Sequence, residues 1–130
     1  MFAASDAVDT DFTAKLVDIC PDGPSINLCE GIVRARHRLG ADRVDPIEPG
    51  EVVEYHIDLQ PTANVFRARH RIGIEISSSN FPAFDRNLNT GDPIASAHTP
   101  VVARQRVHHG GAASSRLMLS VRTTGSSQTH

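Results

Sequence analysis

The sequence predicts an all-β sandwich. Short alternations of apolar and polar residues recur along the chain, each bounded by Gly, Pro, Asn or Asp, and no stretch shows the 3.6-residue period of an amphipathic helix. The clearest alternations lie at residues 12–17, 53–60 and 72–76. The 130 residues, 39% hydrophobic and 22% charged, suit one small domain with a hydrophobic core. We therefore expect a domain over residues 1–122 and a frayed polar tail over residues 123–130.

The first predicted strand covers residues 12–17 and ends at a Pro- and Gly-rich turn, residues 21–24. A short return strand begins at Ile26, breaks at residues 30–31, and is followed by a further strand over residues 32–38. This last strand places three arginines on one face, which we expect to be a solvated outer face. An anion or carbohydrate site is the alternative for the same residues: Arg34, Arg36 and Arg38.

A loop covers residues 39–50, and the next strand, residues 53–60, has the cleanest alternation of the chain. The following strand, residues 72–76, is expected to bury the face made by Ile72, Ile74 and Ile76. Beyond the loop after it, the pattern predicts a strand over residues 101–107, a polar turn over 108–114 and a last strand at 117–121.

Two cysteines flank the first turn. Cys20 and Cys29 are close enough in sequence for a hairpin disulfide. Two free, partly buried thiols are the expected state, because the chain shows no export signal.

Residues 77–91 predict an ordered loop. Its Asn and Asp side chains close turns on their own backbone, and two phenylalanines supply apolar anchors. The side chains concerned are Asn80, Phe81, Phe84, Asp85, Asn87 and Asn89.

This loop carries a family resemblance. ISSSNFP at residues 76–82, FDRN at 84–87 and NTG at 89–91 resemble the C-terminal domain of the cocaine-esterase-like and X-Pro dipeptidyl-peptidase-like hydrolases. Further blocks agree in the same order, so that the resemblance runs from residue 4 to residue 121. These are DTDFTAKL at 9–16, PDG at 21–23, EGI at 30–32, RAR at 34–36, PT at 61–62, NVF at 64–66 and HRI at 70–72. The chain departs from the family where Arg69 replaces an expected glycine and Leu88 an expected proline.

The resemblance implies a jelly-roll, galactose-binding-like β-sandwich attached to a catalytic α/β-hydrolase domain. It implies a non-catalytic accessory role, in which the sandwich stabilises the hydrolase domain, in the same or a separate polypeptide, and helps to wall its active site. We expect the domain contact to use Phe81, Phe84, Asp85, Arg86 and Asn87. The family's domain is larger, so we also expect the first strands of the sandwich to be missing. The edge left open would then favour a homo-oligomer or aggregation.

Catalytic residues are not expected in this chain. The Gly-x-Ser-x-Gly elbow of an α/β-hydrolase is absent from the sequence, and so is the strand–helix alternation that would carry it. His108 and His109 are interpreted as turn histidines, because neighbours on a strand point to opposite faces and ligate one metal poorly. No cofactor is expected, and the chain is predicted to be inactive alone. Substrate choice among peptides, esters and amides would reside outside it.

Other function classes are disfavoured. A net charge of -2, one Tyr and no Trp argue against nucleic-acid binding, and the absence of eighteen consecutive apolar residues argues against a membrane span. The N-terminal residues lack a signal-like pattern, which predicts a cytoplasmic protein. A stand-alone carbohydrate or small-ligand binding module and an inactive gene fragment are the alternatives to the accessory domain.

Overall fold

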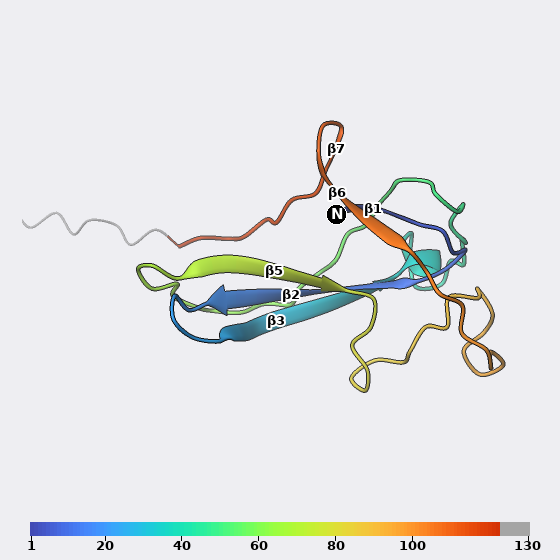
Figure 1. Ribbon diagram of the computed structural model, residues 1–130, viewed down its shortest axis with the longest axis horizontal. Coiled ribbons are helices and arrows are strands. Elements are labelled where there is room, and N and C mark those ends of the chain that lie inside the picture. Colours follow the sequence, from blue (N-terminus) through green and yellow to red (C-terminus); the bar gives the residue numbers. More distant parts are fainter. Residues whose placement is uncertain (123–130) are drawn as a thin grey trace, which may run out of the picture.

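The computed structural model describes residues 1–122, and these residues form two antiparallel sheets with one short 3-10 turn (Figure 1). One sheet has the order β4-β1-β6-β7 and the other the order β3-β2-β5. The predicted all-β sandwich is therefore confirmed. The elements are β1 (Phe2–Ser5), β2 (Asp11–Ile19), β3 (Ser25–Arg34), the 3-10 turn η1 (Ala35–His37), β4 (Val53–Glu54), β5 (Arg71–Ser77), β6 (Gln105–Gly110) and β7 (Ala113–Ser114).

β2 is the central strand of the three-stranded sheet. It pairs with β3 from Asp11↔Arg34 to Ile19↔Ser25 and with β5 from Thr13↔Ser77 to Ile19↔Arg71. Its residues are buried on both faces, except Lys15 and Ile19, which are partly exposed. The strand predicted at residues 12–17 is therefore correct and extends further in both directions.

β3 runs unbroken through Gly31, where the sequence pattern predicts a break. The glycine has a packing role instead. A Cβ at this position would lie 1.9 Å from the carbonyl oxygen of Asp58, so only glycine lets residues 57–58 cross the sheet at this point. β3 then ends at Arg34, because the chain turns into η1 and the Ala35 amide donates a hydrogen bond to the Thr10 carbonyl.

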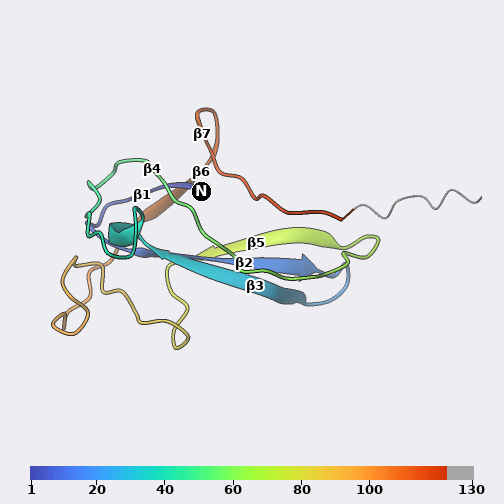
Figure 2. The ribbon, with the colours of Figure 1, turned by 180° about the vertical axis from the view of Figure 1, so that it is seen from behind.

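The segment predicted as the cleanest strand, residues 53–60, pairs only at Val53–Glu54 (Figure 2). Its apolar side chains serve the core instead of a sheet ladder. Tyr55 packs against Phe12 with ring centroids 4.8 Å apart, and Ile57 lies against the same cluster. This core joins both sheets and is completed by Met1, Ala3, Val33, Ala35, Ile47, Val53 and Val107.

The isoleucines of β5 do not form a buried face, so that prediction is wrong. Ile72, Ile74 and Ile76 remain 52%, 43% and 37% exposed. The reason is their position: β5 pairs with residues 13–19 of β2, beyond Phe12, whereas the core cluster is centred on Phe12.

The C-terminal third also differs from expectation. β6 begins at Gln105 and continues through His108 and His109, which are therefore strand residues and not turn residues. The strand continues because it pairs with β1, which the pattern did not predict, and then forms a hairpin with β7. Residues 117–121 have no strand assignment, since they pair with no neighbour in the part of the chain described. The predicted polar tail, 123–130, lies outside the described residues.

Arg69 adopts a left-handed backbone conformation, with φ of 69°. This is the position at which the family resemblance leads us to expect glycine. Glycine enters this region without steric cost, whereas other L-residues pay for the contact of Cβ with the backbone. The turn before β5 has therefore kept the geometry that favours glycine.

Candidate domain-contact loop

Residues 78–104 form a long loop between β5 and β6 at one end of the sandwich (Figure 1). Side chains of β2, β3 and the segments next to them hold it at three points. Asn80 donates to the Glu30 carboxylate at 2.9 Å, Asn87 contacts two buried aspartates, and Arg36 donates to the backbone carbonyls of residues 91 and 92 at 3.0 and 2.9 Å. The prediction that this loop is ordered agrees with these contacts.

The buried aspartate pair, Asp9 and Asp11, is the main anchor of the loop. Both side chains are almost completely excluded from solvent. The Asn87 amide nitrogen donates to Asp9 Oδ2 at 3.0 Å and to Asp11 Oδ1 at 2.8 Å, and the Asn87 oxygen accepts from the Asn89 amide at 2.9 Å. Every polar atom of the Asn87 amide is therefore used, and the middle of the loop is held in one place.

Two arginines balance the two carboxylates. Arg34 makes a bidentate pair with Asp11, at 2.8 and 2.9 Å, and Arg36 Nε lies 3.5 Å from Asp9 Oδ2. The Asp11 hydrogen bond, supported by the charges of Asp9 and Asp85, raises the pKa of Arg34. Buried charges are tolerated when they are paired in this way.

The arginines do not form the solvated outer face that the sequence predicts. The exposed fractions of the Arg34, Arg36 and Arg38 side chains are 20%, 11% and 13%, and Arg38 pairs with Asp45 at 2.6 Å. Each of the three guanidinium groups already has a carboxylate partner, so none offers an unpaired positive charge to an anion. The structure therefore does not support the alternative of an anion site.

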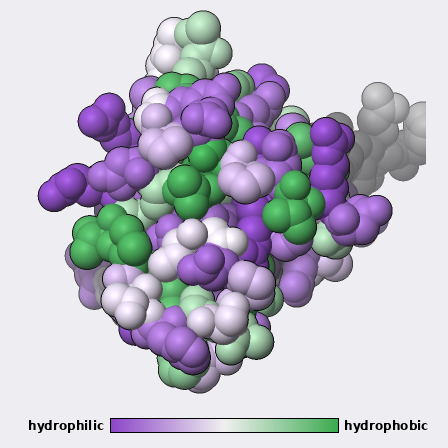
Figure 3. Space-filling model, turned by 90° about the vertical axis from the view of Figure 1, so that its right-hand side faces the viewer, coloured by the Kyte–Doolittle hydropathy of each residue, from purple (hydrophilic) through white to green (hydrophobic). Residues whose placement is uncertain are grey.

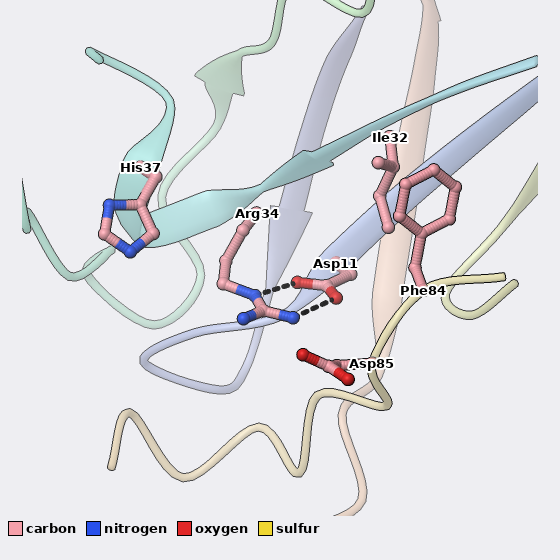
Figure 4. Close-up of a pocket in the computed structure, with 6 residues that line it drawn as sticks. All are labelled: Asp11, Ile32, Arg34, His37, Phe84 and Asp85. Atoms are coloured by element: carbon pink, nitrogen blue, oxygen red, sulfur yellow. Dashed lines mark hydrogen bonds and ion pairs between the residues drawn. The ribbon is translucent and has the colours of Figure 1, made fainter. Parts of the chain in front are cut away.

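A shallow hollow of about 280 Å³ lies where the loop meets β2 and β3 (Figure 4). Phe84 lies beside Ile32 on one side, and Asp85 points toward the Arg34–Asp11 pair on the other. His37 closes the far end. The hollow is thus lined by two apolar side chains, an imidazole ring, the Arg34–Asp11 ion pair and the Asp85 carboxylate.

The structure divides the five residues predicted for domain contact into two groups. Phe81, Phe84, Asp85 and Arg86 are exposed, whereas Asn87 is half-buried and holds the loop to the sandwich. Phe81 is 72% exposed. Figure 3, which views this end of the molecule, shows several separate apolar areas among polar side chains. The exposed large apolar side chains of the loop are Phe81, Phe84, Ile94, Val101 and Val102.

Sequence reasoning missed the anchors on the sandwich side, Asp9, Asp11, Arg34 and Arg36. A signal for them exists in the chain: Asp-x-Asp at 9–11 and Arg-x-Arg at 34–36 have the same spacing. Antiparallel register then places Asp11 directly opposite Arg34. The pattern becomes informative only once the pairing of the two strands is known.

The cysteines are free thiols. Cys29 faces Leu16 across the hairpin, whereas Cys20 follows Ile19 at the turn, four residues along β2 and so roughly 13 Å away along the strand. A disulfide needs Cα atoms within about 7 Å. The hairpin disulfide is therefore not compatible with this register.

Among residues 1–122, no three His, Cys, Asp or Glu side chains are grouped closely enough to hold a metal ion. The same residues contain no helix with the length and apolar character needed to cross a bilayer.

Comparison with known proteins matches residues 1–118 to the family described as the X-Pro dipeptidyl-peptidase C-terminal non-catalytic domain. The chain belongs to this family. It is 49% identical over 123 residues to the cocaine esterase of Rhodococcus sp. (strain MB1 Bresler). The aligned region covers 93% of this chain and 21% of the esterase. The chain is thus a non-catalytic C-terminal domain of the cocaine-esterase and X-Pro dipeptidyl-peptidase type.

Solved structures agree with the membership in this C-terminal domain family. An aminopeptidase from a marine sediment Thaumarchaeota archaeon matches 80% of this chain and 19% of its own, with 33% identity and a TM-score of 0.75. An α-amino acid ester hydrolase matches 83% of this chain and 20% of its own, with 28% identity and a TM-score of 0.71. The chain therefore spans about a fifth of the length of these larger hydrolases.

Proposed function

We propose that this domain binds an α/β-hydrolase catalytic domain, in the same or a separate polypeptide, stabilises it, and helps to wall its active-site cleft. The family membership supports an accessory role, because the matched domain is non-catalytic and forms a minor part of larger hydrolases. The contact would be made by the exposed part of the loop, Phe81, Phe84, Asp85 and Arg86.

The observation that carries this proposal is an exposed apolar loop on a rigid base. Phe81 is largely exposed, yet the loop around it is held by hydrogen bonds to the buried carboxylates of Asp9 and Asp11 and to the half-buried Glu30. A pre-ordered loop loses little conformational entropy on binding, so its apolar side chains contribute more of their burial to affinity. Exposed aromatic side chains of this kind are typical of interface anchors.

The reaction class follows from the relatives' names. They include an esterase, an ester hydrolase and an aminopeptidase, all of which cleave an acyl bond with water. We infer that the partner of this domain acts on ester, amide or peptide bonds. The nucleophile and its elbow would come from that partner, and this chain would supply neither.

The test compares Phe81→Ala with Val65→Ala, measured on the hydrolase that carries this domain. Val65 is a matched control, because it is 83% exposed and precedes the turn at the opposite end of β5. We expect Phe81→Ala to lower the thermal stability of the hydrolase and its activity on a p-nitrophenyl ester, with the isolated domain unchanged in stability. Equal behaviour of the two variants in the hydrolase would refute the contact role.

A further inference from the structure

We propose that the hollow between the loop and strands β2 and β3 receives a basic side chain, an arginine or a lysine, from the surface of the hydrolase catalytic domain. This inference rests on the proposed contact between the loop and that domain, and it names the chemical group that the partner supplies. The hollow is lined by Asp11, Ile32, Arg34, His37, Phe84 and Asp85 (Figure 4).

Asp85 carries the unpaired negative charge of the hollow. The residue is exposed, and its carboxylate makes no hydrogen bond or ion pair within the part of the chain that the structure describes. The neighbouring carboxylates do have partners. Asp11 binds Arg34 through two hydrogen bonds, at 2.8 and 2.9 Å. Asp9 Oδ2 lies 3.5 Å from Arg36 Nε. Three carboxylates thus meet two guanidinium groups, and the negative charge that remains attracts a cation.

The carboxylate of Asp11 is not available to that cation. Its Oδ1 atom accepts from Arg34 Nε and from the Asn87 amide, both at 2.8 Å, and its Oδ2 atom accepts from Arg34 Nη2. The Asp11 side chain is also only 1% exposed. Asp85 lies on the side of the loop and points toward this ion pair (Figure 4). It is therefore the acceptor for a positively charged group that enters the hollow.

The other walls of the hollow suit the stem of a long basic side chain. Phe84, which is 36% exposed, lies beside the half-buried Ile32 (Figure 4). Arginine and lysine cover apolar surface with their methylene groups while the charged end stays in a polar environment. A cation close to an aromatic ring gains a further attraction. The volume of the hollow, about 280 Å³, leaves room for one such side chain.

An acidic side chain is the opposite occupant, and it fits less well. Arg34 Nη1 has no partner among the residues described and is able to donate to a carboxylate. The charge of Arg34 is already matched by Asp11, however, and an acidic guest would also lie near the Asp85 carboxylate. Like charges brought together in an interface disfavour binding. Removal of the Asp85 charge therefore weakens the contact with a basic guest and strengthens it with an acidic one.

The experiment removes this charge in the hydrolase that carries the domain. Asp85→Asn keeps the size of the side chain, and Asp92→Asn is the matched control, because Asp92 is exposed on the same loop and does not line the hollow. We expect Asp85→Asn to shorten the half-life of activity at a raised temperature about three- to tenfold relative to the control. Added salt narrows this difference, and Asp85→Glu, which keeps the charge, recovers most of the half-life. In urea unfolding of the isolated chain, Asp85→Asn behaves as wild type.

A photo-crosslink identifies the occupant directly. Phe84→p-benzoylphenylalanine places a light-activated ketone at the hollow of the same hydrolase. We expect mass spectrometry after irradiation to find this position joined to a peptide of the catalytic domain, at or next to an arginine or lysine.

Two results would overturn the inference. One is an Asp85→Asn variant that is as stable as the Asp92→Asn control or more stable, the second case indicating an acidic guest. The other is a crosslink confined to the sandwich, or one to a catalytic-domain peptide without a basic residue. If Phe81→Ala destabilises the hydrolase and Asp85→Asn does not, the domain contact stands and only the basic guest is refuted. If neither variant has an effect, the domain contact itself fails.

Discussion

Replacing Asn87 tests whether the buried aspartate pair is what holds the loop. Asn87→Ala removes two hydrogen bonds to carboxylates, at 2.8 and 3.0 Å. A hydrogen bond to a charged group contributes about 1.5–3 kcal/mol, and the two share one donor nitrogen, so we expect a loss of about 2–4 kcal/mol in the free energy of unfolding. Asn87→Asp costs more at neutral pH, because a third carboxylate faces two buried ones.

The assay is urea unfolding followed by the fluorescence of Tyr55, the single tyrosine, which is buried beside Phe12. The aspartate variant has a further signature. Repulsion raises the pKa of the new carboxyl, so its deficit relative to wild type narrows as the pH falls and the group becomes protonated. Arg86→Ala, next to it and exposed, is the control, with a change within about 0.5 kcal/mol. An Asn87→Ala variant as stable as this control would refute the anchoring argument.

Two further predictions concern the backbone and the core. Arg69→Gly removes the steric strain of a left-handed residue, with φ of 69°, and we expect the free energy of unfolding in urea to rise by about 0.5–1 kcal/mol. Arg67→Gly, at a position of ordinary φ, is the control and is expected to lower it by a similar amount. A lower free energy of unfolding in Arg69→Gly would contradict the assigned strain. Burial raises the pKa of Tyr55 to about 12, from an ordinary value of 10.0. Its contribution to stability is therefore complete below about pH 10 and is lost between about pH 10 and pH 12, by about 3 kcal/mol. The Tyr55→Phe variant does not lose stability at alkaline pH, because it has no hydroxyl to ionise. At neutral pH it is at least as stable as wild type, because the Tyr55 hydroxyl has no hydrogen-bond partner among the residues described. A clear loss of stability at neutral pH would show that the hydroxyl is hydrogen-bonded.

The period-two pattern located some strands and misled at others, for one physical reason. Residues 12–17 belong to the central strand, and the apolar side chains at its even positions, Phe12, Ala14 and Leu16, are all buried. Residues 53–60 show the same alternation, but their backbone leaves the ladder after Glu54 and crosses the sheet. At residues 53–60 the alternation marks buried side chains without strand pairing, whereas at β5 it marks a paired strand whose isoleucines stay exposed, so alternation predicts an extended backbone and does not decide burial.

In the contact loop, too, the sequence predicts some features and not others. Its Asx-forming residues and phenylalanines indicate an ordered loop with apolar side chains. The sequence leads us to expect Asn87 in the domain contact, however, whereas its role as an anchor depends on Asp9 and Asp11, more than seventy residues away in the sequence. No local pattern contains a contact of that separation.

Local residue type and order were enough to predict the all-β class, a strand at residues 12–17, the turn before β3 and the family to which the chain belongs. Only the tertiary structure decided the rest. It placed Asp11 opposite Arg34, made Gly31 a crossing point for the chain, and left the isoleucines of β5 exposed. Each of these features depends on which segments, distant in the sequence, pack together. The free energy of burial and ion pairing comes from those contacts and not from the residues taken one at a time.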